Sequence, residues 1–167
     1  MSCERQVRAY IDIETTGLDP ESDSLTVIGI AIEREEEVRL VQLCEGDLTR
    51  KGLLAALAEV GSLYSWNGLR FDLPFIATRL DVNLAESFRH CDLKQRCREC
   101  GLYGGLKGVE RRLGISRLTA GMSGRDAVRL WNDYRSRGSA AALERLLAYN
   151  AEDVRNLAHI RRRLRVE

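Results

Sequence analysis

Four acidic residues lie inside apolar stretches of this 167-residue chain. Asp12 and Glu14 follow an apolar dipeptide, Asp72 precedes a run of four apolar residues, and Asp153 follows Leu146-Leu147-Ala148. A carboxylate in such surroundings is costly unless it is paired with a positive charge or binds a metal ion. The chain must therefore fold so that these side chains meet one another or a cation.

The first part of the chain predicts an antiparallel meander. Residues 7–14, 25–32 and 38–43 are each predicted to form a strand. The first is expected to be mostly buried, and the second is apolar with frequent β-branched residues. Residues 19–24 read as a loop, and residues 33–37 as a charged turn. The third segment alternates in polarity, which favours a place at the sheet edge.

The second part predicts strands that alternate with helices. Helical spacing runs from Leu53 to Val60, a short strand covers 63–66 and ends at Asn67-Gly68, and a helix covers 71–80. A fifth strand is expected at 88–93, followed by helices at 106–113, 126–137 and 140–165. This order indicates a mixed α/β sheet flanked by helices. No repeat or linker is evident, so we expect residues 1–167 to form a single domain.

These elements bring the acidic residues toward one point. Asp12 and Glu14 are two residues apart on a strand, so both side chains leave the same face. Their strand is expected at the sheet centre, and the carboxyl end of such strands commonly binds ligands. Asp72 follows the exit of another strand, and Asp153 shares a helix face with Tyr149 four residues earlier. Clustered carboxylate oxygens suit Mg²⁺ or Mn²⁺.

Charge is unevenly distributed along the chain. Residues 1–90 hold 9 Lys or Arg against 16 Asp or Glu, whereas residues 91–167 hold 17 against 9. An acidic half with metal ligands beside a basic half suits a protein that binds phosphate groups. Solvated helix faces give the same pattern, so charge alone leaves both interpretations open.

Cysteine content points to a reducing compartment. The chain has five cysteines, no secretory leader and no apolar run of the roughly 20 residues that span a membrane. We therefore expect a cytoplasmic protein without membrane association. Cys97 and Cys100, with Cys91 and His90 nearby, suggest a zinc or iron–sulfur site, but the second pair that closes a structural zinc site is absent. Ordinary thiols are the alternative.

Three motifs resemble those of the DEDD 3′–5′ exonuclease superfamily, within the RNase H-like fold. Asp12-Ile13-Glu14-Thr15-Thr16-Gly17-Leu18 resembles the first motif, Asn67-x-x-x-Phe71-Asp72 the second and Tyr149-x-x-x-Asp153 the third. A tyrosine four residues before the last aspartate marks the DEDDy subgroup.

A further stretch narrows the resemblance. Leu106-Lys107-Gly108-Val109-Glu110-Arg111-Arg112-Leu113-Gly114-Ile115-Ser116-Arg117, together with the second and third motifs, resembles the YprB-type RNase H-like domain. This group consists of predicted exonucleases, and the resemblance covers nearly the whole chain. It implies an RNase H-like mixed five-stranded sheet, an antiparallel meander plus parallel strands, flanked by helices.

The resemblance also implies the roles of the acidic residues. Asp12, Glu14, Asp72 and Asp153 would hold two divalent cations, Mg²⁺ or Mn²⁺, with Asp12 bridging both. Tyr149 would position the attacking water or help to deprotonate it. Because a tyrosine pKa lies near 10, orientation is the favoured role.

Other residues are expected to contact the substrate. Thr15, Thr16 and Gly17 would lie beside the terminal nucleotide, and Leu18 would wedge against its base or pack in the core. Phosphate contacts are predicted for Arg70, Lys107 and Arg117, with plain surface charge as the alternative. Asn67 would hold the turn before Asp72 or touch the substrate. Trp66, Trp131 and Tyr134 would stack on bases or pack in the core.

The function implied is a metal-dependent 3′–5′ exonuclease that hydrolyses single-stranded DNA or RNA to nucleotides. An RNase H-fold endonuclease would also use clustered acids, and a non-catalytic nucleic-acid-binding module would keep the fold. The expected partner is a nucleic acid, with a helicase or another nucleic-acid-processing protein as a possible second one.

Overall fold

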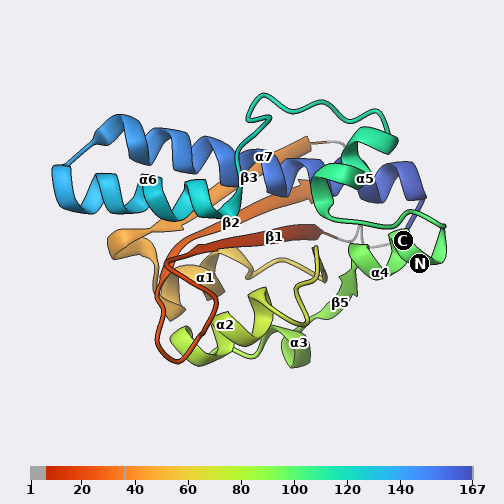
Figure 1. Ribbon diagram of the computed structural model, residues 1–167. Helices are drawn as coiled ribbons and strands as arrows, with labels where there is room; N and C mark the ends of the chain where they lie inside the picture. Colours follow the sequence, from red (N-terminus) through yellow and green to blue (C-terminus); the bar gives the residue numbers. More distant parts are fainter. Residues whose placement is uncertain (1–6, 36, 167) are drawn as a thin grey trace.

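A mixed five-stranded sheet forms the centre of the computed structural model, which describes residues 7–35 and 37–166 (Figure 1). The strands are β1 (Arg8–Thr15), β2 (Leu25–Arg34), β3 (Glu37–Cys44), β4 (Ser62–Ser65) and β5 (Arg89–Asp92). Their order is β3-β2-β1-β4-β5. The β1–β2 and β2–β3 pairs are antiparallel, and the β1–β4 and β4–β5 pairs are parallel. The predicted mixed sheet, with β1 central and β3 at an edge, is confirmed.

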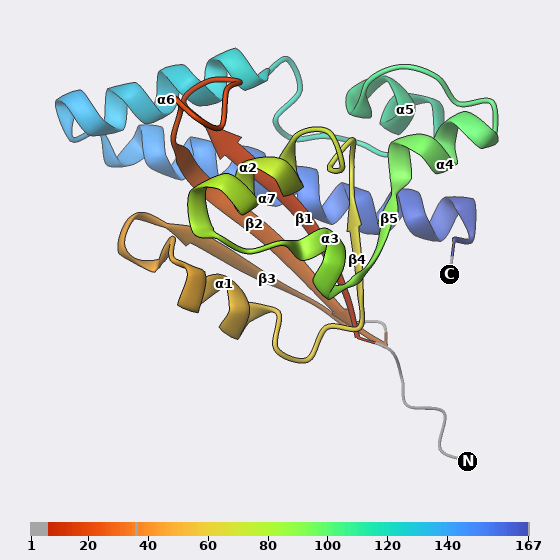
Figure 2. The ribbon, with the colours of Figure 1, turned by 90° about the horizontal axis from the view of Figure 1, so that it is seen from below.

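Helices cover both faces of this sheet. They are α1 (Arg50–Ala56), α2 (Asp72–Leu80), α3 (Leu84–Ser87), α4 (Leu93–Glu99), α5 (Leu106–Arg112), α6 (Gly124–Arg137) and α7 (Ala140–Leu164). Figures 1 and 2 show α6 and α7 on one face and α1 and α2 on the other. The long helix α7 contacts β1, β2, β3 and β4. It therefore lies across the sheet and faces the central strand.

Alternation along β1 decides which side chains face α7. Ile11 and Ile13 belong to the apolar cluster that includes Phe75 of α2, on the side away from α7. Tyr10 belongs to the cluster that includes Leu157 of α7. Since side chains alternate along a strand, Asp12 and Glu14 leave β1 on the Tyr10 side, toward α7.

The segment predicted as a charged turn at 33–37 contains a buried residue instead. Glu33 lies within β2 and is 2% exposed. It accepts hydrogen bonds from the Tyr10 hydroxyl, from Arg162 Nε at 2.8 Å and from Arg161 Nη2 at 3.2 Å. Burial alone raises the pKa of Glu33, but the bonds from Tyr10 and Arg162 outweigh it and the pKa is lowered. These contacts tie the C-terminal part of α7 to the sheet.

Short helices are the main elements that the sequence did not predict. They are α3, α4 and a 3₁₀ turn at Glu45–Asp47. Helix α4 begins directly after β5, where the Asp92 side chain accepts from Lys94 N at 3.0 Å. Its buried residues, Leu93 and Cys97, join the cluster under α7. Elements of three to seven residues contain too few turns to show a helical period in the sequence.

Candidate active site

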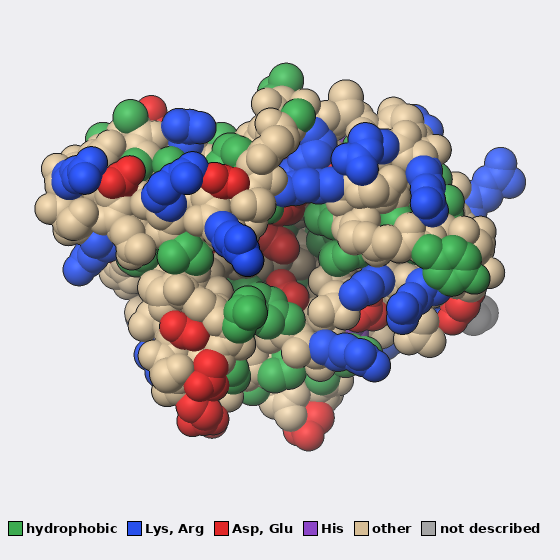
Figure 3. All heavy atoms as spheres, in the orientation of Figure 1, with side chains coloured by type: hydrophobic (Ala, Val, Ile, Leu, Met, Phe, Trp, Pro, Cys, Tyr) green, Lys and Arg blue, Asp and Glu red, His purple; other side chains and the backbone are tan. Residues whose placement is uncertain are grey.

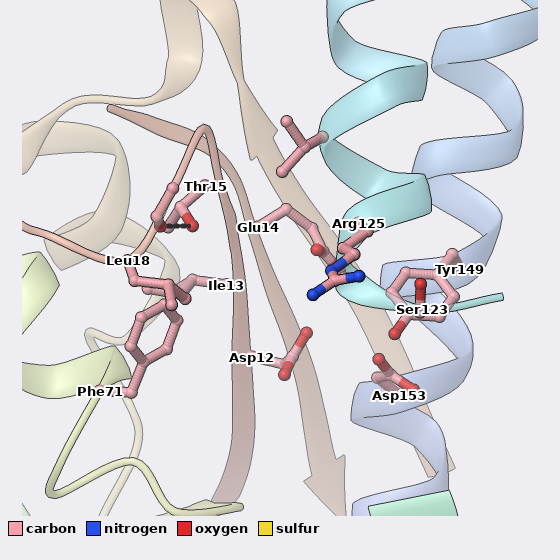
Figure 4. Close-up of a pocket in the computed structure, with 13 residues that line it drawn as sticks. Asp12, Ile13, Glu14, Thr15, Leu18, Phe71, Ser123, Arg125, Tyr149 and Asp153 are labelled. Carbon is pink, nitrogen blue, oxygen red and sulfur yellow. Dashed lines mark hydrogen bonds between the residues drawn. The ribbon is translucent and has the colours of Figure 1, made fainter. Parts of the chain in front are cut away.

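Three carboxylates from two elements meet on the α7 face of the sheet. Asp12 and Glu14 extend from β1 and Asp153 extends from α7, and one oxygen of each lies within 4.8 Å of the others. They line an open cavity of about 780 Å³. Figure 3 shows red acidic side chains at the bottom of a hollow that blue basic side chains surround. In Figure 4 the three carboxylates point toward one another.

Asp72 lies next to this group but does not line the cavity. It is the first residue of α2, is buried, and its Oδ1 accepts a hydrogen bond from Ile13 N at 3.2 Å. The carboxylate thus contacts the backbone between Asp12 and Glu14. Burial raises the pKa of Asp72 to about 7, the charges of Asp92 and Asp153 add to this effect, and hydrogen bonds from its own backbone and that of Ile13 oppose it.

Asn150 of α7 forms hydrogen bonds with Asp12 at a point where the sheet has no side chain, above Gly29. Its Nδ2 donates to Asp12 Oδ2 at 3.0 Å and to the Asp12 carbonyl at 3.2 Å. Its Oδ1 accepts from Gln42 Nε2 at 3.0 Å. Asp12, Gly29 and Gln42 are neighbours across β1, β2 and β3. A Cβ on Gly29 would lie 2.7 Å from Asn150 Cγ, so the amide fits only because residue 29 has no side chain.

Sequence reasoning did not assign a role to Asn150. The available signal was Gly29, an isolated glycine within an apolar β-branched strand, which often marks a close approach of another group.

Arg117 forms an ion pair with Asp153. The guanidinium is 7% exposed, donates to Asp153 and contacts Glu110 at 2.7 and 2.9 Å. Glu110 is fully buried and also accepts from Asn156 Nδ2 at 3.0 Å. The sequence predicted a phosphate contact for Arg117, whereas the structure places its charge among carboxylates. The arrangement suits orientation of Asp153 instead.

Tyr149 lines the cavity, and Lys107, which does not line it, contacts Tyr149. Lys107 Nζ donates to the Tyr149 hydroxyl at 3.1 Å and lies 4.7 Å from the ring centre. Burial and the charges of Asp153, Glu14 and Asp12 raise the pKa of Tyr149. The hydroxyl therefore keeps its proton at neutral pH and remains free to donate it in a hydrogen bond. The predicted place of Lys107 near the substrate is consistent with this position.

The opposite wall is apolar. Leu18 and Phe71 line the cavity across from Tyr149 (Figure 4), and Leu18 is 83% exposed. The alternative that Leu18 packs in the core is therefore wrong, although its role as a wedge remains a prediction. Thr15 and Gly17 line the cavity, and Thr15 Oγ1 donates to the Gly17 carbonyl at 2.5 Å.

Thr16 does not line the cavity. Its backbone N donates to the Ser24 carbonyl, and its hydroxyl accepts from Ser24 N, both at 2.9 Å. These bonds close the loop that carries Gly17 and Leu18, so the direct contribution of Thr16 is to the shape of that loop.

The start of α6 completes the cavity and was not predicted. Ser123, Gly124, Arg125 and Val128 line it. Arg125 is exposed, and Figure 4 shows its guanidinium between Glu14 and Tyr149 in that view. The sequence places this segment in a loop and helix start more than 100 residues from β1, and nothing in its spacing indicates that it returns to the first motif.

Two predicted substrate contacts lie elsewhere. Asn67 and Arg70 line a second hollow with residues of β5 and α4. Asn67 has a φ of 60°, its N donates to Asp92 Oδ1 at 2.9 Å, and its Oδ1 accepts from Lys94 Nζ at 3.1 Å. These contacts agree with the interpretation that Asn67 holds the turn before Asp72.

The remaining candidates are three aromatic residues and the cysteines. Trp66, Trp131 and Tyr134 pack against apolar clusters. Cys44, Cys91, Cys97 and Cys100 are free thiols. Within residues 7–35 and 37–166, the group formed by Asp12, Glu14 and Asp153 is the one that has metal-binding geometry. Cys3 lies outside the described residues.

The electrostatics of the site favour a divalent cation. Burial, then the charges of Asp153, Glu14 and Asp72, raise the pKa of Asp12 well above its usual value. Burial and the charges of Asp153 and Asp72 raise the pKa of Glu14 in the same way. Buried carboxylates that repel one another are stabilised by a hard cation with oxygen ligands. The residues present therefore fit a Mg²⁺ or Mn²⁺ site.

The family assignment follows from a match over nearly the whole chain. A family model described as the RNase H superfamily matches residues 9–165. The chain belongs to the RNase H superfamily. No curated protein matches its sequence.

Solved structures share the fold at low identity. The family B DNA polymerase from the archaeon Pyrobaculum calidifontis is 16% identical with a TM-score of 0.75, and the match covers 95% of this chain and 24% of the polymerase. A structure described as the apo form of a nuclease is 24% identical with a TM-score of 0.62, and the match covers 98% of this chain and 76% of that one.

Brucella melitensis NrnC is a third relative. Its structure bound to pGG is 24% identical with a TM-score of 0.63, and the match covers 94% of this chain and 71% of NrnC. Its structure with bound Mg²⁺ is 22% identical, with a TM-score of 0.59 and coverage of 95% and 71%. At these identities the likeness shows the fold.

The described residues form no helix that is both long and apolar enough to cross a membrane.

Proposed function

We propose that this protein is a metal-dependent 3′–5′ exonuclease of the DEDDy subgroup and the YprB-type group, within one domain that spans residues 1–167. It hydrolyses phosphodiester bonds of single-stranded DNA or RNA and releases nucleotides. One observation carries the proposal: Asp12, Glu14, Tyr149 and Asp153 line a single open cavity. Among the structural relatives are a nuclease and NrnC, which binds pGG, and both support this interpretation.

Asp12, Glu14 and Asp153 would hold two divalent cations, with Asp72 as the adjacent fourth carboxylate. Such ions activate a water and stabilise the leaving oxygen in phosphodiester hydrolysis. The Mg²⁺ bound to NrnC supports the choice of metal. Asn150 and Arg117 orient the two carboxylates that extend from different elements, Asp12 and Asp153.

Tyr149 orients the attacking water in this proposal. Its hydroxyl accepts a hydrogen bond from Lys107 and, with its raised pKa, keeps its own proton for donation. Lys107 and Arg125 supply positive charge beside the carboxylates for the phosphate of the terminal nucleotide. Leu18 and Phe71 offer apolar surface to its base.

The proposed setting of the enzyme is the cytoplasm. The free thiols of Cys44, Cys91, Cys97 and Cys100 support a cytoplasmic location. A helicase or another nucleic-acid-processing partner would supply long single strands.

The test uses matched single-stranded DNA and RNA oligonucleotides labelled at the 5′ end, with Mg²⁺, Mn²⁺ or EDTA. We expect shortening from the 3′ end with either metal and none with EDTA. Asp12→Ala should abolish cleavage, whereas Asp133→Ala, a carboxylate change on α6 paired with Arg137, should not.

Two outcomes would replace the proposal. Products unaffected by a blocked 3′ end would show an endonuclease. Binding without any cleavage in either metal would show a non-catalytic nucleic-acid-binding module.

A further inference from the structure

A second hollow of about 230 Å³ lies at the carboxyl ends of β4 and β5. Its walls come from the turn after β4, from the end of β5 and from α4, and they include Asn67, Leu69, Arg70, Asp92, Lys94 and Arg98. The proposed hydrolysis uses none of the α4 residues.

The hollow has an excess of positive charge. Arg70, Lys94 and Arg98 line it with a single carboxylate, Asp92. That carboxylate already accepts from Asn67 N at 2.9 Å and from Lys94 N at 3.0 Å. Both bonds go to Asp92 Oδ1 and fix the turn and the start of α4. Within the described residues Asp92 forms no ion pair with the three cations, which outnumber it.

The cations are available to a ligand. Lys94 Nζ donates to Asn67 Oδ1 at 3.1 Å, which leaves two of its three N–H groups. Arg70 and Arg98 are exposed, and in the described part of the chain their guanidinium groups form no hydrogen bond or ion pair. By contrast, neighbouring Arg96 is paired with Glu99 at 2.9 Å. Like charges gathered without counter-ions favour the binding of an anion.

The second hollow adjoins the carboxylate cavity. Phe71 lines the cavity and Arg70 lines the hollow. Consecutive Cα atoms are about 3.8 Å apart, so one short turn forms a shared wall between the two. The exposed side chain of Leu69 lies on the hollow side of this wall.

We propose that this hollow binds a backbone phosphate of a single-stranded nucleic acid whose 3′ end occupies the carboxylate cavity. The proposal rests on the proposed function, because it extends the substrate beyond the terminal nucleotide. A strand leaving the cavity over the turn would bring a phosphate to Arg70, Lys94 and Arg98. Proteins that bind single strands commonly combine such cationic grooves with apolar contacts to bases, here Leu69.

The size of the effect follows from counter-ion release. For single strands each phosphate contact contributes about 0.7 to the slope of log K against log salt. At about 0.1 M salt, one lost contact therefore weakens binding about fivefold. Arg70→Ala and Arg98→Ala combined remove the contact to this one phosphate, so they should weaken binding about fivefold and lower the slope by about 0.7.

The experiment measures fluorescence anisotropy of a labelled single-stranded oligonucleotide over a salt series with Mg²⁺. The full chain carries Asp12→Asn so that the strand is not consumed. Arg155→Ala is the matched control, because this exposed arginine lies two residues after Asp153 on the opposite side of α7. The control should change affinity less than twofold, and thermal midpoints confirm that each variant is folded.

The outcomes separate this proposal from the proposed function. Unchanged affinity and salt slope in the Arg70→Ala/Arg98→Ala variant would overturn the phosphate site, while cleavage by the wild type would still support the exonuclease. If the variant loses affinity as expected but the wild type releases no nucleotide, the phosphate site stands and the exonuclease fails. Failure of the Asp12→Asn chain to bind any oligonucleotide overturns the site as well.

Discussion

Replacement of Gly29 by alanine tests how the sheet positions Asp12. The new Cβ would lie 2.7 Å from Asn150 Cγ and 2.9 Å from its Nδ2, with Oδ1 closer still. Asn150 is fully buried, so its amide must shift and release Asp12. Overpacking costs about 1–3 kcal/mol, and loss of a hydrogen bond to a charged group costs about 1.5–3 kcal/mol. The gain from reduced backbone freedom is below about 1 kcal/mol.

We therefore expect Gly29→Ala to lower the free energy of unfolding by about 3 kcal/mol, measured by urea denaturation. It should also reduce the rise in thermal midpoint on adding Mg²⁺, because Asp12 is no longer held. Gly108→Ala is the matched control: Gly108 lies in α5, and the space that its new Cβ would occupy is open. That change should be neutral or stabilise by up to about 1 kcal/mol.

A double-mutant cycle identifies the clash directly. In Gly29→Ala/Asn150→Ala the colliding amide is absent, so the combined loss should be smaller than the sum of the two single losses by at least about 1 kcal/mol. Strict additivity, or a Gly29→Ala protein as stable as the wild type, would refute the argument that the missing side chain at residue 29 makes room for Asn150.

Three other results are expected. Tyr149→Phe should slow cleavage about 100-fold while calorimetry shows unchanged Mn²⁺ binding, and lost metal sites would contradict an orienting role. Arg117→Met leaves buried Glu110 unpaired and should cost about 3–5 kcal/mol in denaturation experiments, a loss that Glu110→Gln should partly restore. Because the pKa values of Asp12 and Glu14 are raised in the folded state, metal-free stability should fall as pH rises above about 4, and Mg²⁺ should raise the thermal midpoint more at pH 8 than at about pH 5.5. An equal shift at both pH values would show that protons and metal do not compete.

The strand β1 shows what local sequence can predict. Alternation alone indicates that Asp12 and Glu14 share a face, and the i to i+4 spacing places Tyr149 and Asp153 together on α7. Both patterns depend only on the geometry of one element, and the antiparallel meander follows from local composition in the same way.

Contacts between distant elements could not be predicted in this way. The place of Arg117 beside Glu110 and Asp153 depends on how the segment after α5 folds back onto α7. The arrival of Arg125 at the cavity depends on the angle at which α6 packs. Neither leaves a periodic signal, because a charged residue in a loop has the same sequence pattern whether it faces solvent or a carboxylate.

Helix α7 is attached to the sheet at two places, near its middle and near its C-terminal end. Asn150 bonds to β1 next to the carboxylates, and Arg161 and Arg162 bond to Glu33 of β2. These two sets of contacts prevent α7 from shifting or rotating relative to the strands. The spacing between the acidic groups is therefore established when the chain folds. The entropy cost of ordering these side chains belongs to folding, and a ligand binds to a preorganised site.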